Sequence, residues 1–193
     1  MERRLSKLTG IDSEGKTLRG MAVVYNSDSE NLGGFIERIA PGAFQRSLSS
    51  ENHEIRAFWN HDSRLLLGRR LNNTLRVSDT SAGLEVEISL PSTGFAKDLA
   101  VLVARGDCNQ MSFGFTLPDR ASETWSPHES DPGLRRRTIL SCDLHEVSAV
   151  SIPAYPETSL AVRSMKDHDT WQRHKSFFNL LNILNRVTVR ADG

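Results

Sequence analysis

The chain has 193 residues and carries 24 Lys+Arg against 24 Asp+Glu, so its formal net charge is zero. This balance gives no electrostatic reason to expect a nucleic acid or an anionic membrane as the partner. The longest apolar run, residues 99–104, is far shorter than the roughly 20 residues that span a bilayer. Two cysteines, Cys108 and Cys142, are too few for a disulfide framework and lack the spacing of a zinc site. We therefore expect a soluble protein of a reducing compartment that needs no metal or other cofactor.

Short strands separated by turn residues account for most of the chain. The clearest is 84–90, where Leu84, Val86 and Ile88 alternate with polar residues. In chain order, the sequence predicts strands at residues 20–25, 55–60, 75–78, 84–90, 111–117 and 139–152, the last with an internal break. The expected fold class is therefore mainly β with peripheral helices, built as an antiparallel barrel or sandwich.

Two helical segments interrupt the strands. A short turn should begin at Pro41, because proline is favoured at the first helical position. A longer helix should follow Ser92 or Thr93 as its cap and end at residue 105, since Gly106 then occupies the position after the helix.

Two polar regions complete the chain. Residues 118–133 contain proline and few apolar residues, which predicts a long surface loop. Residues 164–193 carry five basic and three acidic groups, and their apolar residues follow a helical period. We expect residues 1–163 to form the main domain and 164–193 a helical tail, either docked on that domain or free to bind a partner.

The segment 111–117 supplies a candidate nucleophile. On a strand its apolar side chains point to one face, while Ser112, Gly114 and Thr116 point to the other. A serine on this open face can act as a nucleophile only with a base in hydrogen-bond reach, and is otherwise a plain strand residue. Cys108 ranks below it, because no adjacent basic residue would lower its thiol pKa.

His61 is the candidate general base. It follows the apolar segment 55–60 and precedes Asp62, so we expect it where a strand meets a loop. A rigid strand end can hold an imidazole while leaving one ring edge accessible. The simpler alternative is a histidine that merely completes a turn.

Glu146 is the candidate acidic partner. In a regular strand it shares one face with Leu144 and Val150. A carboxylate there is costly unless a cation or hydrogen-bond donor meets it. An imidazole is one such partner, as in serine hydrolases, and an arginine is the alternative. His145 would point to the opposite face unless a bulge exchanges the two.

Taken in order, these segments resemble the tailed-phage prohead proteases, serine peptidases that mature viral capsids. Each segment is weak alone, but the ordered set is specific and spans about residues 10–163. The matching segments are residues 20–25 (GMAVVY), 39–44 (IAPGAF) with Ser47 and Leu48, 59–62 (WNHD), 106–115 (GDCNQMSFGF), 144–148 (LHEVS) and 153–155 (PAY). The family is distantly similar to the herpesvirus assemblins, which implies a closed antiparallel β-barrel.

The resemblance also implies catalytic roles. It makes His61 the base, Ser112 the nucleophile and Glu146 the acid that orients the base. The assemblins use a histidine as the third member, so His145 is an alternative at that place. The implied mechanism is acyl transfer through Ser112 Oγ, followed by hydrolysis of the acyl-enzyme.

The resemblance implies partners as well. The expected substrates are the scaffold segment of the major capsid protein and the protease itself, inside the assembling prohead in the host cytoplasm or in the cytoplasm of a bacterium with a prophage. A homo-oligomer is a further option, and residues 164–193 would serve encapsidation or autocleavage. The competing interpretation is a non-catalytic scaffold or chaperone module with the same fold, which would not need Ser112, His61 and Glu146 to converge.

Overall fold

The computed structural model describes residues 2–12, 14–131 and 133–151, and it shows a mainly β fold with few helices. The strands are β1 (Glu2–Ile11), β2 (Thr17–Val24), β3 (Phe35–Ile39), β4 (Arg56–Trp59), β5 (Asp62–Arg69), β6 (Leu75–Asp79), β7 (Gly83–Ser89), β8 (Gln110–Thr116), β9 (Glu123–Pro127), β10 (Arg135–Ile139) and β11 (Asp143–Val150). The helices are α1 (Gln45–Ser49), α2 (Gly94–Arg105) and the 3-10 helix η1 (Arg120–Ser122).

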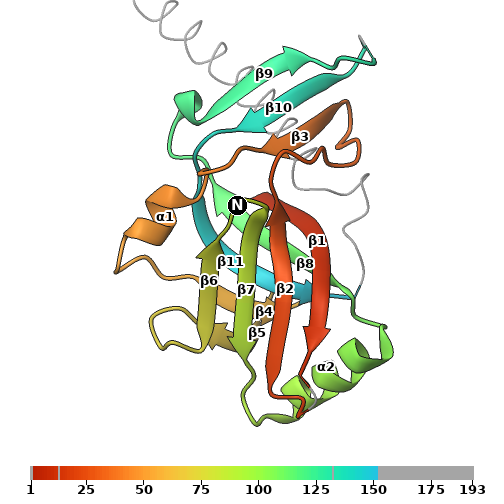
Figure 1. The fold of residues 1–193 in the computed structure, drawn as a ribbon, viewed down its shortest axis with the longest axis vertical. Helices are drawn as coiled ribbons and strands as arrows, with labels where there is room; N and C mark the ends of the chain where they lie inside the picture. The colour runs from red at the N-terminus through yellow and green to blue at the C-terminus, as the bar shows by residue number, and fades with distance from the viewer. Residues whose placement is uncertain (1, 13, 132, 152–193) are drawn as a thin grey trace, which may run out of the picture.

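Eight of these strands form one curled sheet, in the order β5-β4-β11-β8-β1-β2-β7-β6. In Figure 1 the half containing β1, β2, β7 and β6 lies in front of the half containing β8, β11, β4 and β5. Neighbouring strands in the sheet are antiparallel, except that β11 pairs with β4 in parallel. This parallel pair brings the end of β4 alongside β11, which positions the candidate site described below.

The expectation of a closed barrel is wrong. Strands β5 and β6 are the two edges of the large sheet, and no ladder joins them among the described residues. Near the turn that connects them, a Cβ on Gly68 of β5 would come within 2.6 Å of the carbonyl oxygen of Thr74, the residue before β6. From that contact β6 pairs along its length with β7, so the sheet folds over on itself without closing.

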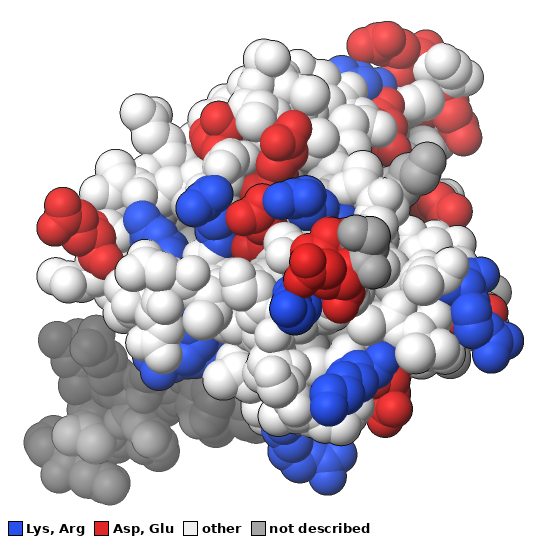
Figure 2. Space-filling view, turned by 60° about the horizontal axis from the view of Figure 1, so that its bottom comes forward, with Lys and Arg blue, Asp and Glu red and all other residues white. Residues whose placement is uncertain are grey.

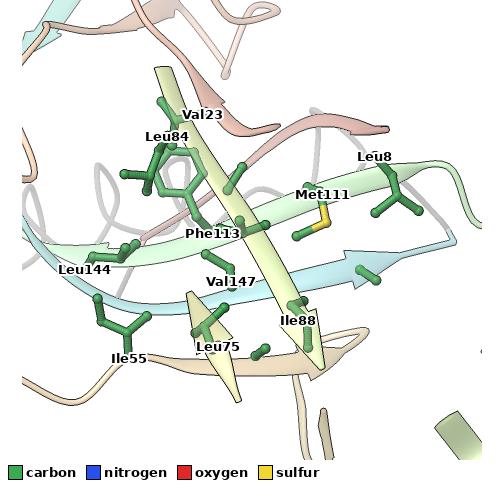
Figure 3. Close-up of a cluster of buried hydrophobic side chains, with 14 of the residues drawn as sticks. Leu8, Val23, Ile55, Leu75, Leu84, Ile88, Met111, Phe113, Leu144 and Val147 are labelled. Atoms are coloured by element: carbon green, nitrogen blue, oxygen red, sulfur yellow. The ribbon is translucent and has the colours of Figure 1, made fainter. Parts of the chain in front are cut away.

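Apolar side chains from both halves of the curled sheet fill the space between them (Figure 3). Leu84, Val86 and Ile88 on β7 are all buried, which confirms the alternation predicted for that strand. They face residues of the opposite half such as Phe113 and Val147. Because apolar surface removed from water drives folding, this shared core holds the two halves together.

The predicted long helix is confirmed. α2 begins after Thr93 and ends at Arg105, and Gly106 follows with φ of 84°. The Gly106 N–H bonds back to the Val103 carbonyl, which is the left-handed ending that glycine favours. α2 packs at the periphery against β1 and β5 (Figure 1).

The segment 118–133, predicted as a surface loop, instead includes regular secondary structure. It contains η1 and strand β9, which joins β10 and β3 in a separate three-stranded sheet. Most side chains of β9 are exposed, so its sequence carries no apolar alternation, and Pro127 suits an edge strand.

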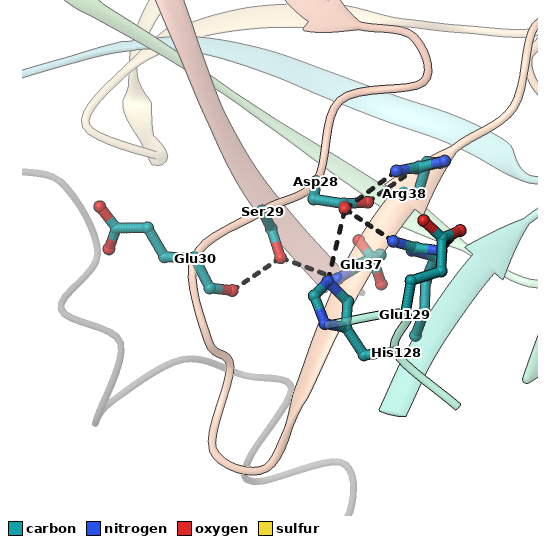
Figure 4. Close-up of polar contacts among 8 residues, drawn as sticks. Asp28, Ser29, Glu30, Glu37, Arg38, His128 and Glu129 are labelled. Carbon is teal, nitrogen blue, oxygen red and sulfur yellow. Dashed lines mark hydrogen bonds and ion pairs between the residues drawn. The ribbon is translucent and has the colours of Figure 1, made fainter. Parts of the chain in front are cut away.

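Arginines of this small sheet form ion pairs with carboxylates of differing exposure. Arg136 contacts Asp28 and Glu129 at 3.1 Å each. Asp28 also binds Arg38 at 2.7 Å (Figure 4). Arg137 contacts the buried Glu37 at 3.0 Å. The arginines after the predicted loop are therefore residues of β10, and Arg136 and Arg137 are buried in ion pairs.

Charged groups of both signs intersperse on the face shown in Figure 2, in keeping with the zero net charge. None of the helices in the described ranges is long and apolar enough to cross a membrane. The predicted tail at 164–193 and its boundary at residue 163 lie outside the described residues.

Candidate active site

Strand β8 has the two faces that its sequence predicts. Met111, Phe113 and Phe115 are buried in the shared core. Ser112 lies on the opposite face, and it is also buried, with 1% of its surface exposed. The strand thus holds the serine rigidly, between β1 and β11.

His61 lies at the tip of a tight hairpin between β4 and β5. Trp59 pairs with Asp62, which leaves Asn60 and His61 as a two-residue turn with φ of 53° and 60°. Positive φ at both positions is the geometry of a type I′ turn, which suits the twist of the flanking strands. A histidine with positive φ is uncommon, and such strained residues concentrate at functional sites.

Asn60 fastens this hairpin tip to the end of β11. Its backbone N–H bonds to the Ala149 carbonyl at 2.9 Å, and its side-chain oxygen accepts a bond from the Ser151 N–H at 3.1 Å. The position of His61 is therefore fixed relative to β11, which carries the candidate acid.

A bulge in β11 decides where that acid points. Leu144 lies opposite Phe115 and Glu146 lies opposite Gly114, so His145 is an extra residue in the ladder. Beyond the bulge Val147 is in the core. Glu146 therefore shares a face with Ser112 and not with Leu144, and the expectation based on regular alternation is wrong on this point.

His61 and Glu146 are in direct contact. His61 Nδ1 lies 2.9 Å from Glu146 Oε1, with the two side chains 14% and 3% exposed. An ionised carboxylate only accepts hydrogen bonds, so the contact requires the proton on Nδ1 and leaves Nε2 of a neutral ring as an acceptor. The other carboxylate oxygen, Oε2, accepts a 2.8 Å bond from Ser148 Oγ.

Ser112 lies beside this pair on the next strand. Its ladder partner on β11 is Ser148, so the two serines face the same side of the sheet. Glu146 is the diagonal neighbour of Ser112 across the ladder, a relation that sets Cβ atoms roughly 7–8 Å apart. The base thus comes from the turn after β4, the acid from β11 and the serine from β8, and these three strands are neighbours in the sheet.

His145, the alternative third catalytic residue, has other partners. Its Nε2 lies 2.8 Å from Thr116 Oγ1, and its ring centroid lies 6.0 Å from that of His53. Burial, and secondarily the nearby His53, lowers the pKa of His145. Asp62, the residue after His61, binds Arg64. Hydrogen bonds from Arg64 lower the pKa of the Asp62 carboxyl to about 2.

Cys108 lacks the surroundings of a reactive thiol. It is fully buried just before β8, and burial raises its pKa to about 11. The thiol is therefore protonated at neutral pH, and the thiolate is the nucleophilic form. Within the described ranges, no cluster of three or more His, Cys, Asp or Glu side chains could hold a metal ion.

No role for Ser148 or Asn60 is predicted from the sequence. The spacing of Ser148 could have indicated its contact with Glu146, because a hydroxyl two residues after a carboxylate lies on the same strand face. The signal for Asn60 was its residue type, because asparagine tolerates positive φ next to a turn.

The sequence profile of the caudovirus prohead serine proteases matches residues 4–172 of the 193-residue chain. The chain belongs to this family. The match confirms the resemblance found in the sequence, and it points to a serine peptidase that acts in the phage prohead. Searches of curated proteins and of solved structures produced no match. A prohead protein lies inside the host cell during assembly, so this compartment follows from the family.

Proposed function

We propose that this protein is a serine endopeptidase in which Ser112 is the nucleophile, His61 the general base and Glu146 the acid that orients it. The observation that carries the proposal is the 2.9 Å contact between His61 Nδ1 and Glu146 Oε1, on the sheet face that holds Ser112. His145 is not chosen, because its imidazole is bonded to Thr116.

The chemistry follows from the protonation state of His61. With the proton held on Nδ1 by Glu146, Nε2 removes the proton of Ser112 Oγ as this oxygen attacks the peptide carbonyl. The imidazolium then gives its proton to the leaving amine, which departs and leaves an acyl ester on Ser112. Water, deprotonated by His61, hydrolyses the ester and restores the serine. Glu146 stays ionised throughout and stabilises the charged ring.

Ser112 is not accessible to a substrate in this structure. With 1% of its surface exposed, Ser112 cannot meet a peptide carbonyl until the groups that cover it move. We therefore propose that substrate binding or assembly in the prohead opens the site. Such an opening would restrict proteolysis to the compartment where it is needed.

The proposed substrates are the scaffold segment of the major capsid protein and the protease chain itself. The support is family membership, since a prohead protease acts among capsid proteins. We also propose that residues 164–193 serve encapsidation or autocleavage, because their composition differs from that of the domain and the family match ends at residue 172.

Co-expression with the cognate capsid protein tests this function. Wild type and Ser112→Ala should be compared by mass spectrometry of the capsid protein, with Ser122→Ala as a control. Ser122 is another buried serine, bonded to Asp119 and remote in the fold. Cleavage by wild type and Ser122→Ala, and none by Ser112→Ala, is the expected result. Cleavage by Ser112→Ala would overturn the nucleophile, and a folded wild type that cleaves nothing while promoting assembly would favour the scaffold module.

A further inference from the structure

The second oxygen of the Glu146 carboxylate is held by a residue outside the three proposed catalytic groups. Ser148 Oγ lies 2.8 Å from Glu146 Oε2, and Ser148 is fully buried. A buried hydroxyl that donates to a carboxylate forms one of the stronger hydrogen bonds in proteins. By holding Oε2, this bond also helps to fix the position of the other oxygen, Oε1, which contacts His61.

A glutamate carboxylate has little intrinsic preference for one orientation. Its terminal torsion, between an sp³ and an sp² carbon, is broad, so the plane of the carboxylate is set by its partners. If Oε2 loses the Ser148 hydroxyl, one of the contacts that fix the plane of the carboxylate is gone, and the bond that His61 Nδ1 donates to Oε1 can lengthen or bend. The proton on Nδ1 is then no longer fixed.

Ser148 is itself held rigidly. It lies in the middle of β11, opposite Ser112 on β8 and opposite Phe58 on β4. Its backbone is therefore fixed on both sides by ladders, and alternation places its side chain on the face of Glu146. A rigid donor of this kind can hold the carboxylate in one orientation.

We propose that Ser148 is a positioning residue of the peptidase: its hydroxyl locks the Glu146 carboxylate so that Oε1 holds the proton of His61 on Nδ1. The inference rests on the proposed function, because it assigns Ser148 a role in preparing His61 as the base. Ser148 does not touch the reacting atoms in this role. It acts through Glu146.

The rate at which an alkyl fluorophosphonate labels the full-length protein tests this role. It is measured in proheads co-expressed with the capsid protein, where we propose that the site opens. The probe forms a bond from its phosphorus to an activated serine oxygen and releases fluoride, so it reports on Ser112 without a known cleavage site. Ser148→Ala should react about 10- to 100-fold more slowly than wild type, the range expected for losing a hydrogen bond to a charged group. Ser148→Thr keeps the hydroxyl and should recover most of the rate. Ser122→Ala, which also removes a hydrogen bond from a buried serine to a carboxylate, here a part-buried bond to Asp119, should react at the wild-type rate.

A second measurement separates positioning from general stability. Two-bond ¹H–¹⁵N spectra of ¹⁵N-histidine-labelled protein show which ring nitrogen carries the proton, and His61→Gln identifies the His61 signal. Wild type should show His61 protonated on Nδ1 alone, whereas Ser148→Ala should show both tautomers. Ser122→Ala should leave the His61 signal unchanged. This comparison does not need the threonine variant, whose extra methyl group has to fit a fully buried site.

The outcomes are distinct. Unchanged labelling and an unchanged His61 tautomer in Ser148→Ala overturn the positioning role. Complete loss of labelling in folded Ser148→Ala, with labelling retained in Ser112→Ala, overturns both this role and the choice of nucleophile. If wild type in these proheads is not labelled, the proposed function fails, and the tautomer comparison still decides whether Ser148 positions the ring.

Discussion

His61 and Glu146 are 85 positions apart in the chain, yet His61 Nδ1 lies 2.9 Å from Glu146 Oε1. Two local features create this contact. A turn with positive φ presents His61 at the end of β4, and a bulge in β11 turns Glu146 onto the same face of the sheet. Replacing either partner should therefore affect the peptidase more than the fold.

Replacing the acid by its amide should greatly reduce turnover. In Glu146→Gln the amide N–H₂ group can face Nδ1 of His61, which favours the wrong tautomer of the imidazole. We expect kcat to fall by about 10⁴-fold, as for the equivalent change in other serine peptidases. Glu85→Gln, an exposed position on β7, is the matched control and should have no effect. A larger loss of turnover in His145→Ala than in Glu146→Gln would reverse the choice of acid.

The backbone at His61 should make glycine more stable than alanine there. Both His61→Gly and His61→Ala lose the imidazole and should be inactive, but only glycine adopts φ of 60° without strain. Urea unfolding should show His61→Gly to be more stable than His61→Ala by about 1 kcal/mol. At Ser63, a strand residue in β5, the alanine variant should instead be more stable than the glycine variant. Equal stabilities of the two His61 variants would argue against the strained turn.

The buried thiol of Cys108 should be inert in the native protein. Because burial raises its pKa to about 11, almost no thiolate is present at pH 8. Iodoacetamide should modify Cys108 only after denaturation, and Cys108→Ala should cleave the capsid protein as wild type does. Rapid alkylation of the native protein, accompanied by loss of proteolysis, would make Cys108 the nucleophile instead.

His145 should make the fold less stable in mild acid. Its pKa in the folded protein is lowered, by burial first and by His53 second, with opposing contributions from Asp143 and Glu146. The unfolded chain takes up the proton near pH 6.5 while the folded protein does not, so the unfolding free energy falls as pH decreases below about 6.5. Urea unfolding between pH 7.5 and 5 should show this decrease. The decrease should be smaller in His145→Gln, and an identical pH dependence in both proteins would refute it.

The buried arginine of the small sheet should be important for stability. Arg137 pairs with Glu37, which is 2% exposed, and Arg137→Ala leaves that carboxylate without this partner. Losing one partner of a buried ion pair costs about 3–5 kcal/mol. Arg135→Ala, at an exposed position on the same strand, should cost far less in urea unfolding. Similar losses in the two variants would show that the pair contributes little.

The sequence predicted those elements whose physical signals are local. The alternation of 84–90 and the glycine after Arg105 correspond to β7 and α2. Strand β9 was missed because its exposed side chains carry no apolar pattern. The open sheet was missed because closure depends on how β5 and β6 diverge after their shared turn, which no local signal encodes.

The candidate site was predictable in its residue types and not in its geometry. A serine among small residues on one strand face, a histidine at a strand end and a carboxylate next to apolar residues all stand out in the sequence. The contact between His61 and Glu146 depends on a bulge at His145, and period-two alternation alone placed Glu146 on the wrong face. The role of Ser148 depends on the orientation of one carboxylate, which only coordinates reveal.

The most direct test of the proposed peptidase is to identify the residue that an alkyl fluorophosphonate modifies. After labelling of the full-length protein in proheads co-expressed with the capsid protein, where we propose that the site opens, peptide mass spectrometry should find the adduct on Ser112. None is expected in His61→Ala, and a strongly reduced amount in Glu146→Gln. An adduct on another residue, or cleavage of the capsid protein by a wild type that is never labelled, would contradict the account.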